Sequence, residues 1–155
     1  GYAMGGGLEV ALACDLRITE SQAQMALPEA AVGLLPCAVG TQNLAWLVGE
    51  GWAKRMILCG ERVSAQQALD IGLVEAIVES GQALEQALLW AQKSEQQSPT
   101  SVAACKRLIQ NTRSHPLAVG MVCERDEFVN LFNSNDQKEG VQAFLEKRQP
   151  QWTNS

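Results

Sequence analysis

The chain has 155 residues, of which 46% are hydrophobic and 19% are charged, and its formal net charge is −5. This composition is typical of a soluble globular protein and excludes an intrinsically disordered one. The negative charge argues against a nucleic-acid partner, because binding phosphates requires clustered lysine and arginine. No apolar run is long enough to predict a membrane span.

The five cysteines predict neither a disulfide framework nor a metal centre. Their number is odd, no Cys-x-x-Cys pair occurs, and the single histidine is His115. A structural zinc site needs four such ligands at short, characteristic spacings. We therefore expect reduced, mostly buried thiols, a cytoplasmic location and no metal ligands.

The first half of the chain predicts a mixture of short helices and strands. The predicted elements are, in chain order, a helix at residues 8–14, strands at 16–19 and 24–27, and helices at 41–48 and 52–59. Ser64 and Gln67 then form a capping-box pattern for a further helix. Gly72 can end that helix in the left-handed conformation, before a strand at 73–78.

Beyond residue 82 the pattern becomes entirely helical. Apolar residues recur at helical spacing in four successive stretches. Ser98 and Pro99 give the second of these an N-cap and a first-turn proline, and Ser134 begins the fourth. Amphipathic helices must bury their apolar faces somewhere, so residues 83–155 predict a helical tail that docks on another surface.

Three consecutive glycines, Gly5 to Gly7, precede the first predicted helix. They leave backbone N–H groups unshielded at the positive end of the helix dipole, which suits an oxyanion. A Walker A loop requires Gly-Lys-Ser/Thr, and a dinucleotide fingerprint would need glycine at Val10, so neither nucleotide-binding motif is present. A tight turn packed against a neighbouring element is the alternative interpretation of the glycines.

Two glutamates follow these glycines. Glu9 lies one turn later among leucine, valine and alanine, and Glu29 follows a short apolar strand and Pro28. The intervening elements can fold back, so the two carboxyl groups could face each other. Two carboxyl groups in one dry site tend to divide into a general acid and a general base. The alternative is that both are solvated surface side chains.

Together these residues resemble the crotonase, or enoyl-CoA hydratase/isomerase, family. The matching segments are Gly5-Gly6-Gly7-Leu8-Glu9, Ala13-Cys14-Asp15, Leu27-Pro28-Glu29, Gly33-Leu34-Leu35-Pro36, Gly40-Thr41-Gln42, Gly60-Glu61-Arg62-Val63-Ser64-Ala65, Glu139-Gly140 and Ala143-Phe144-Leu145-Glu146-Lys147-Arg148. The resemblance covers nearly the whole chain. Since the chain opens on Gly1 with no methionine or leader, we expect it to be the C-terminal portion of such an enzyme, with a domain-sized stretch before it.

The resemblance implies an α/β fold with two regions. Residues 1–82 would be the C-terminal part of a β-β-α spiral core that holds the active-site glutamates. Residues 83–155 would be an α-helical oligomerisation tail that builds a homotrimer, or a dimer of trimers, and covers CoA. The implied partners are therefore an acyl-CoA substrate and identical subunits, with no cofactor besides the CoA of the substrate.

The implied reaction is hydration of 2-enoyl-CoA to 3-hydroxyacyl-CoA. Glu9 and Glu29 match the two catalytic glutamates, and Gly6 matches a glycine whose N–H forms half of the oxyanion hole. The other half would come from an upstream loop, so the piece alone is expected to be inactive. Many isomerases of the family keep only the second glutamate. Double-bond isomerisation is therefore the alternative, and a non-catalytic assembly role for this piece is a third possibility.

Further residues are implied by the same match. Phe144 and Lys147, three apart on one helical face, would contact the CoA nucleotide and its phosphates; a core phenylalanine and a solvated lysine are the alternative.

The chain departs from the family's common sequence at several positions. The family commonly has Pro-Gly-x-Gly-Gly-Thr-Gln where residues 36–42 read Pro-Cys-Ala-Val-Gly-Thr-Gln. Cys37 thus replaces a glycine whose N–H seats the water, and borders the water and acyl pocket. Asn43 and Trp46 stand at positions where members of the family often have an arginine that makes surface or interface contacts.

Overall fold

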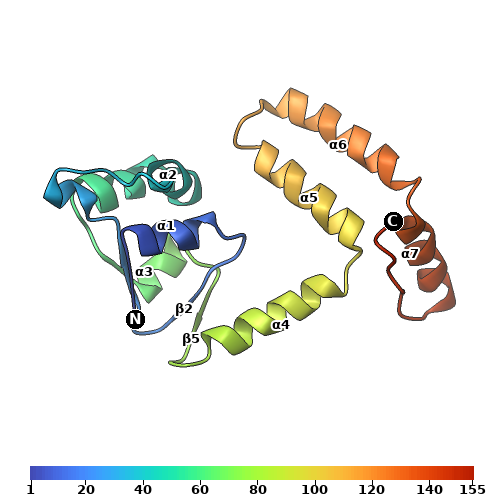
Figure 1. Cartoon of the computed structure of the whole chain (residues 1–155), viewed down its shortest axis with the longest axis horizontal. Coiled ribbons are helices and arrows are strands. Elements are labelled where there is room, and N and C mark those ends of the chain that lie inside the picture. Colours follow the sequence, from blue (N-terminus) through green and yellow to red (C-terminus); the bar gives the residue numbers. More distant parts are fainter. The chain divides into compact units, whose positions relative to one another are not determined.

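The computed structural model describes residues 1–155 and divides them into two compact units, Gly1–Leu88 and Leu89–Ser155 (Figure 1). The elements of the first unit are β1 (Tyr2–Met4), α1 (Gly6–Ala13), β2 (Ile18–Glu20), β3 (Gln24–Ala26), the 3-10 helix η1 (Glu29–Val32), α2 (Gly40–Leu58), β4 (Val63–Ser64), α3 (Ala65–Asp70), β5 (Ala76–Val78) and the start of α4 (Ala83–Glu95). The boundary between the units falls inside α4, a few residues after the division expected at 82.

The strands of the first unit form two small sheets. In one, β1 pairs parallel to β3, with Tyr2 opposite Gln24, and β3 pairs antiparallel to β4. In the other, β2 pairs parallel to β5. The parallel pairs join strands separated by helices, so the unit has the mixed α/β architecture that the sequence predicts.

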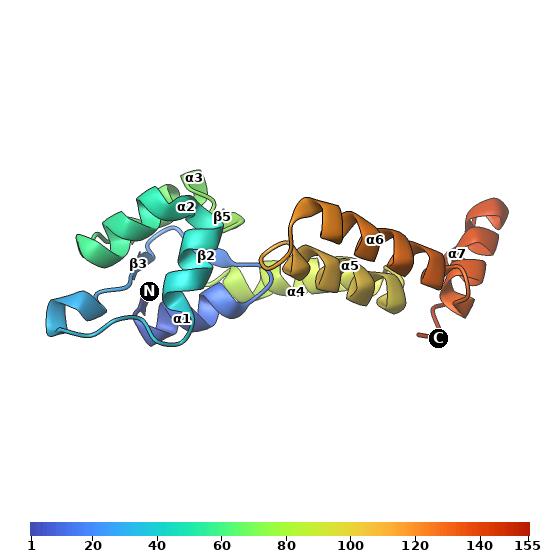
Figure 2. The ribbon, with the colours of Figure 1, turned by 90° about the horizontal axis from the view of Figure 1, so that it is seen from above.

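The core of this unit lies where α1 and α2 pack side by side (Figure 2). Leu8 and Leu12 of α1 are four residues apart on one helix face, and both are buried. Leu44 and Met56 of α2 are fully buried in the same cluster, together with Leu27 after β3. This apolar contact fixes the position of α1, which carries Glu9.

Two helices begin or break at glycine. The helix predicted at residues 8–14 starts earlier, because the N–H groups of Leu8 and Glu9 both donate to the Gly5 carbonyl, at 2.9 and 3.0 Å. Gly6 and Gly7 therefore form its first turn. The helices predicted at 41–48 and 52–59 are one element, α2, interrupted at Gly49, where φ is 76° and ψ is 162°.

The capping box of α3 is confirmed, whereas the strand after it is shorter than predicted. The Ser64 hydroxyl accepts the N–H of Gln67, whose side chain accepts the N–H of Ser64. The N–H groups of Leu73 and Val74 both donate to the Ala68 carbonyl, at 2.8 and 3.2 Å, and so complete the helix end. Only residues 76–78 of the predicted strand at 73–78 pair with β2.

The second unit is helical, as predicted. After α4 come α5 (Pro99–Asn111), α6 (Leu117–Leu131) and α7 (Asn135–Glu146). The Ser98 and Ser134 hydroxyls cap α5 and α7 by accepting N–H groups three residues on, at 3.3 and 3.0 Å. α5 and α6 form an antiparallel pair (Figure 1). None of the helices is both long and apolar enough to cross a membrane.

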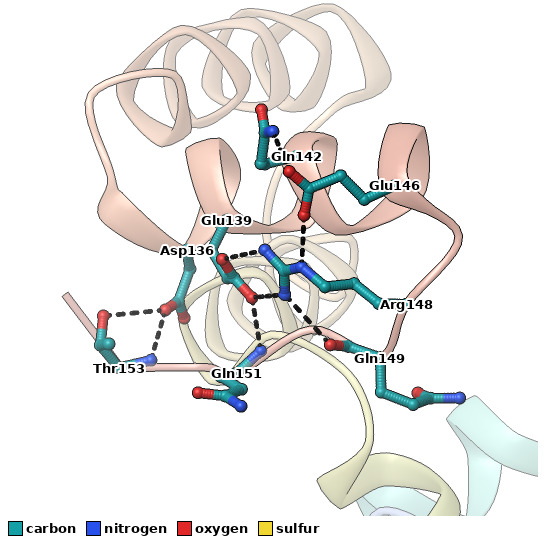
Figure 3. A network of polar contacts seen from close by, with 8 residues as sticks. All are labelled: Asp136, Glu139, Gln142, Glu146, Arg148, Gln149, Gln151 and Thr153. Carbon is teal, nitrogen blue, oxygen red and sulfur yellow. Dashed lines mark hydrogen bonds and ion pairs between the residues drawn. The ribbon is translucent and has the colours of Figure 1, made fainter.

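A polar network ties the C-terminal segment to α7 (Figure 3). Arg148 donates to both carboxylate oxygens of Glu139, at 2.6 and 3.0 Å, and to Glu146 at 2.6 Å. Glu139 also accepts the N–H of Gln151 at 2.7 Å. The Arg148 guanidinium, with this N–H, lowers the pKa of Glu139 to about 2. The network holds the chain that follows α7 against the helix.

Candidate active site

Glu9 is buried and is held by backbone N–H groups. It lies one turn into α1, and only 4% of the residue is exposed. Its Oε1 accepts the N–H of Ala38 at 2.7 Å and that of Gly40 at 2.9 Å. These donors lie on the segment that returns from η1 to α1 just before α2 begins (Figure 2). A carboxylate with two N–H donors has a fixed orientation, because both bonds are charge-assisted.

The return segment approaches Glu9 so closely that residue 40 must be glycine. A Cβ at Gly40 would lie 2.6 Å from Oε1 of Glu9 and 2.8 Å from Cβ of Pro36, which is buried. Both distances are shorter than any normal contact between such atoms. Ala38 and Gly40 were not among the residues that sequence reasoning assigned to the site. The sequence feature that could have pointed to them is the Gly-Thr-Gln motif that begins at Gly40.

Glu29 presents a carboxyl oxygen that has no partner. It opens η1 after Pro28, and its Oε2 is buried without a hydrogen bond. A Cβ at Gly5, the N-cap of α1, would lie 3.1 Å from its Oε1. Buried acceptors without partners are rare in folded proteins, and proton-exchanging groups are among the exceptions. The structure thus places the carboxyl groups of Glu29 and Glu9 near the first turn of the same helix.

Gly6 is the first residue of α1, and its N–H donates no hydrogen bond within the chain. Gly6 is exposed, and a Cβ there would meet nothing within 4 Å, so no side chain packs over this residue. Its N–H points from the positive end of the helix dipole, where partial negative charge is stabilised. This group can therefore donate to an oxygen that becomes charged.

Cys37 follows the buried Pro36 and is itself exposed. The expectation of mostly buried thiols is wrong, because Cys14, Cys59 and Cys105 are exposed as well. The N–H of Cys37, unlike that of Ala38, donates no hydrogen bond to the protein. The role predicted for Cys37 in the water and acyl pocket stays a prediction.

Phe144 and Lys147 do not share a helical face, so that expectation is wrong. Lys147 is the C-cap of α7 and has a φ of 55°, because the helix ends at Glu146. Phe144 is 83% exposed, so the alternative of a core phenylalanine is also wrong for this chain. Their predicted contacts with CoA stay predictions.

The family follows from comparison with known proteins. The model of the enoyl-CoA hydratase/isomerase family matches residues 1–155. The chain belongs to this family. Its fold is the mixed α/β fold of solved enoyl-CoA hydratases: the Bacillus anthracis enzyme aligns over 100% of this chain and 60% of that one, with 39% identity and a TM-score of 0.96. The structure of Pseudomonas aeruginosa DspI shares 64% identity and a TM-score of 0.95, over 98% of this chain and 58% of that one.

Named relatives in this family include hydratases. The 2,3-dehydroadipyl-CoA hydratase of Escherichia coli (strain K12) is 41% identical over 150 residues, which are 97% of this chain and 59% of that protein. The probable enoyl-CoA hydratase 2, mitochondrial, of Arabidopsis thaliana is 40% identical over 99% of this chain and 51% of that protein. The chain thus spans between half and three fifths of these relatives. These shares do not confirm that it corresponds to their C-terminal portion.

Proposed function

We propose that this chain carries the acid–base residues of an enzyme that adds water to 2-enoyl-CoA, giving 3-hydroxyacyl-CoA. The observation that carries the proposal is the pair of carboxyl groups near the first turn of α1. Glu9 is held by two N–H groups, and Glu29 has a buried oxygen with no protein partner. Two carboxyl groups in different surroundings suit one base and one acid.

In the proposed mechanism, Glu9 and Glu29 act on opposite ends of the water addition. Glu9, which already accepts two N–H bonds as a carboxylate, takes a proton from water as the water oxygen bonds to C3. Glu29 delivers a proton to C2, and a proton passing from Glu9 to Glu29 restores both groups. The charge that develops on the thioester oxygen is stabilised by the N–H of Gly6, and one such donor is worth about 10²–10³ in rate.

The names of the relatives support hydration, since those of Escherichia coli and Arabidopsis thaliana are both called hydratases. Isomerisation of the double bond is the competing reaction within the family, and it needs only one carboxyl group to move a proton. The retention of both glutamates is therefore what favours hydration here.

The test uses the protein that contains this chain, with crotonyl-CoA and, separately, a 3-enoyl-CoA. Hydration is followed as the loss of enoyl-thioester absorbance, with product identified by mass. We expect a gain of one water on crotonyl-CoA. Conversion of the 3-enoyl-CoA to its 2-enoyl isomer, without any hydration of crotonyl-CoA, would contradict the proposed hydratase activity and show that the enzyme is an isomerase.

We also propose that the helical second unit assembles identical subunits into a trimer and contributes to the CoA site. Supporting this, α6 has no buried residue, and Leu117 and Phe128 are 79% and 62% exposed. Exposed apolar side chains in such number mark interaction surfaces. If Phe144 and Lys147 contact CoA, alanine at either position should raise KM for crotonyl-CoA and leave kcat nearly unchanged.

A further inference from the structure

Val39 has a backbone conformation that its residue type disfavours. Its φ is 67° and its ψ is 12°, in the left-handed region. The other non-glycine residues with positive φ are Lys147 and Asn154. Valine is the only one of the three that is branched at Cβ, and for such residues this region is a genuine outlier.

This conformation is what brings two donors onto one oxygen. A left-handed residue reverses the local chain direction, so that the N–H groups on either side of it can point into one concavity that binds an anion. Here those groups belong to Ala38 and Gly40, and both donate to Oε1 of Glu9. With a right-handed or extended residue 39, the two N–H groups would point apart.

Burial of the Val39 side chain does not offset the strain, because Val39 is 56% exposed. Backbone hydrogen bonds on both sides of the residue offset it instead. The Val39 carbonyl accepts the N–H groups of Gln42 and Asn43, at 3.2 and 2.9 Å, and so starts α2. The Glu9 carboxylate accepts the N–H groups of Ala38 and Gly40, the residues on either side of Val39. Glu9 and the turn at Val39 therefore fix each other.

We propose that Val39 is a positioning residue, whose left-handed backbone aims the Glu9 carboxylate by directing the Ala38 and Gly40 N–H groups at it. Any residue that keeps the conformation keeps Glu9 in place, and glycine does so without strain. Proline, which fixes φ near −65°, forces the turn open and releases Glu9. The catalytic consequence rests on the proposed function, whereas the conformational one does not.

The first arm of the test compares Val39→Gly with Val32→Gly in the protein that contains this chain. Val32 is also exposed, at 74%, but lies in the right-handed η1. Glycine there adds only freedom to the unfolded chain and should lower Tm. At residue 39 glycine relieves strain, so Tm should rise, by about 3–5 °C if the net gain is tenfold in the folding equilibrium. A fall in Tm for both variants would contradict the claim that the backbone of Val39 is strained.

The second arm measures hydrogen exchange of the Ala38 and Gly40 amides by NMR, and needs no activity. Both should be protected in the parent protein and in Val39→Gly, and both should exchange fast in Glu9→Ala and Val39→Pro. Protection that persists in Glu9→Ala would contradict the positioning of Glu9 by these groups. If Val39→Pro does not fold, the remaining variants still decide the question.

The third arm is kinetic. With crotonyl-CoA, kcat of Val39→Pro should be about 10²-fold below that of Val39→Gly, while KM of the two agrees within about twofold, because only the orientation of Glu9 differs. Equal kcat values for two folded variants would overturn the positioning role. A parent protein with no hydratase activity would instead refute the proposed function, and the Tm and exchange arms would still stand.

Discussion

At the scale of single residues, the carboxyl group of Glu9 is held by backbone N–H groups and by no cation. Oε1 of Glu9 takes both bonds, from Ala38 and Gly40. Glu29 keeps one buried oxygen unpaired. The Glu9 carboxyl group thus has a fixed position and Glu29 has a free acceptor, and both properties suit groups that exchange protons.

Cys37 tests how much the site depends on the side chains beside Glu9. If its backbone N–H seats the water and its thiol only borders the pocket, Cys37→Gly should preserve or raise the hydration rate of short enoyl thioesters. The measurement is kcat/KM with crotonyl-CoA, with circular dichroism as the check on folding. Loss of most activity in a folded variant would show that the thiol itself takes part.

The sequence pattern indicated both glutamates as candidate site residues, but it did not indicate the N–H groups that orient Glu9. Glu9 stood out because a carboxylate among leucine, valine and alanine is unusual. Ala38 carries no side-chain chemistry, and its role depends on the positive φ of Val39, a conformation that valine itself disfavours. In the opposite direction, the shared face expected of Phe144 and Lys147 failed because α7 ends one residue too early.

At the scale of elements, the end of α7 is set by the chain that follows it. Arg148 and Gln151 both bind Glu139, and the ring of Trp152 lies 3.1 Å from where a Cβ at Gly140 would be. Helical periodicity predicted the body of the helix and Ser134 its start. It could not predict where a returning segment, held by an ion pair, would stop the helix.

The same network predicts a pH dependence of stability. The pKa of Glu139 in the folded chain is about 2, below its ordinary value of 4.5, because Arg148 and the Gln151 N–H stabilise the carboxylate. A depressed pKa stabilises the fold above pH 4.5, and this contribution is lost as pH falls from 4.5 towards 2. Glu139→Gln should therefore lower Tm at neutral pH, with a difference from the parent that shrinks over this range.

The matched control is Glu95→Gln, at an exposed residue of α4 that has no ion pair. Its Tm should follow the parent protein at every pH. A Tm difference for Glu139→Gln that stays constant from neutral pH down to about 2 would show that the ion pair with Arg148 is not the cause.

At the scale of the whole molecule, both units leave apolar surface uncovered. In the first unit a cavity of about 380 Å³, lined by Tyr2, Leu8 and Met25 among others, opens between β1, α1 and β2. Neither α4, which contains the boundary between the units, nor α6 of the second unit has a buried residue. Surfaces of this kind are normally covered by another segment or subunit.

Residues 1–155 prepared alone should accordingly associate and show no measurable hydration of crotonyl-CoA. If Gly6 supplies one donor to the thioester oxygen, as proposed, absence of a second would cost about 2.7–4 kcal/mol of transition-state stabilisation. Sedimentation and the absorbance assay on one preparation measure both properties. A monomeric, active preparation would contradict this prediction.

The central claim is that Glu9 and Glu29 together perform the water addition. Its most direct test is kcat for crotonyl-CoA hydration by Glu9→Gln and Glu29→Gln in the protein that contains this chain, beside Glu95→Gln. Each of the first two should lower kcat by about 10²-fold or more, with little change in KM, because each removes a proton-transfer group. Near-parental hydratase activity in Glu9→Gln would contradict the two-glutamate account and leave a one-base isomerase in its place.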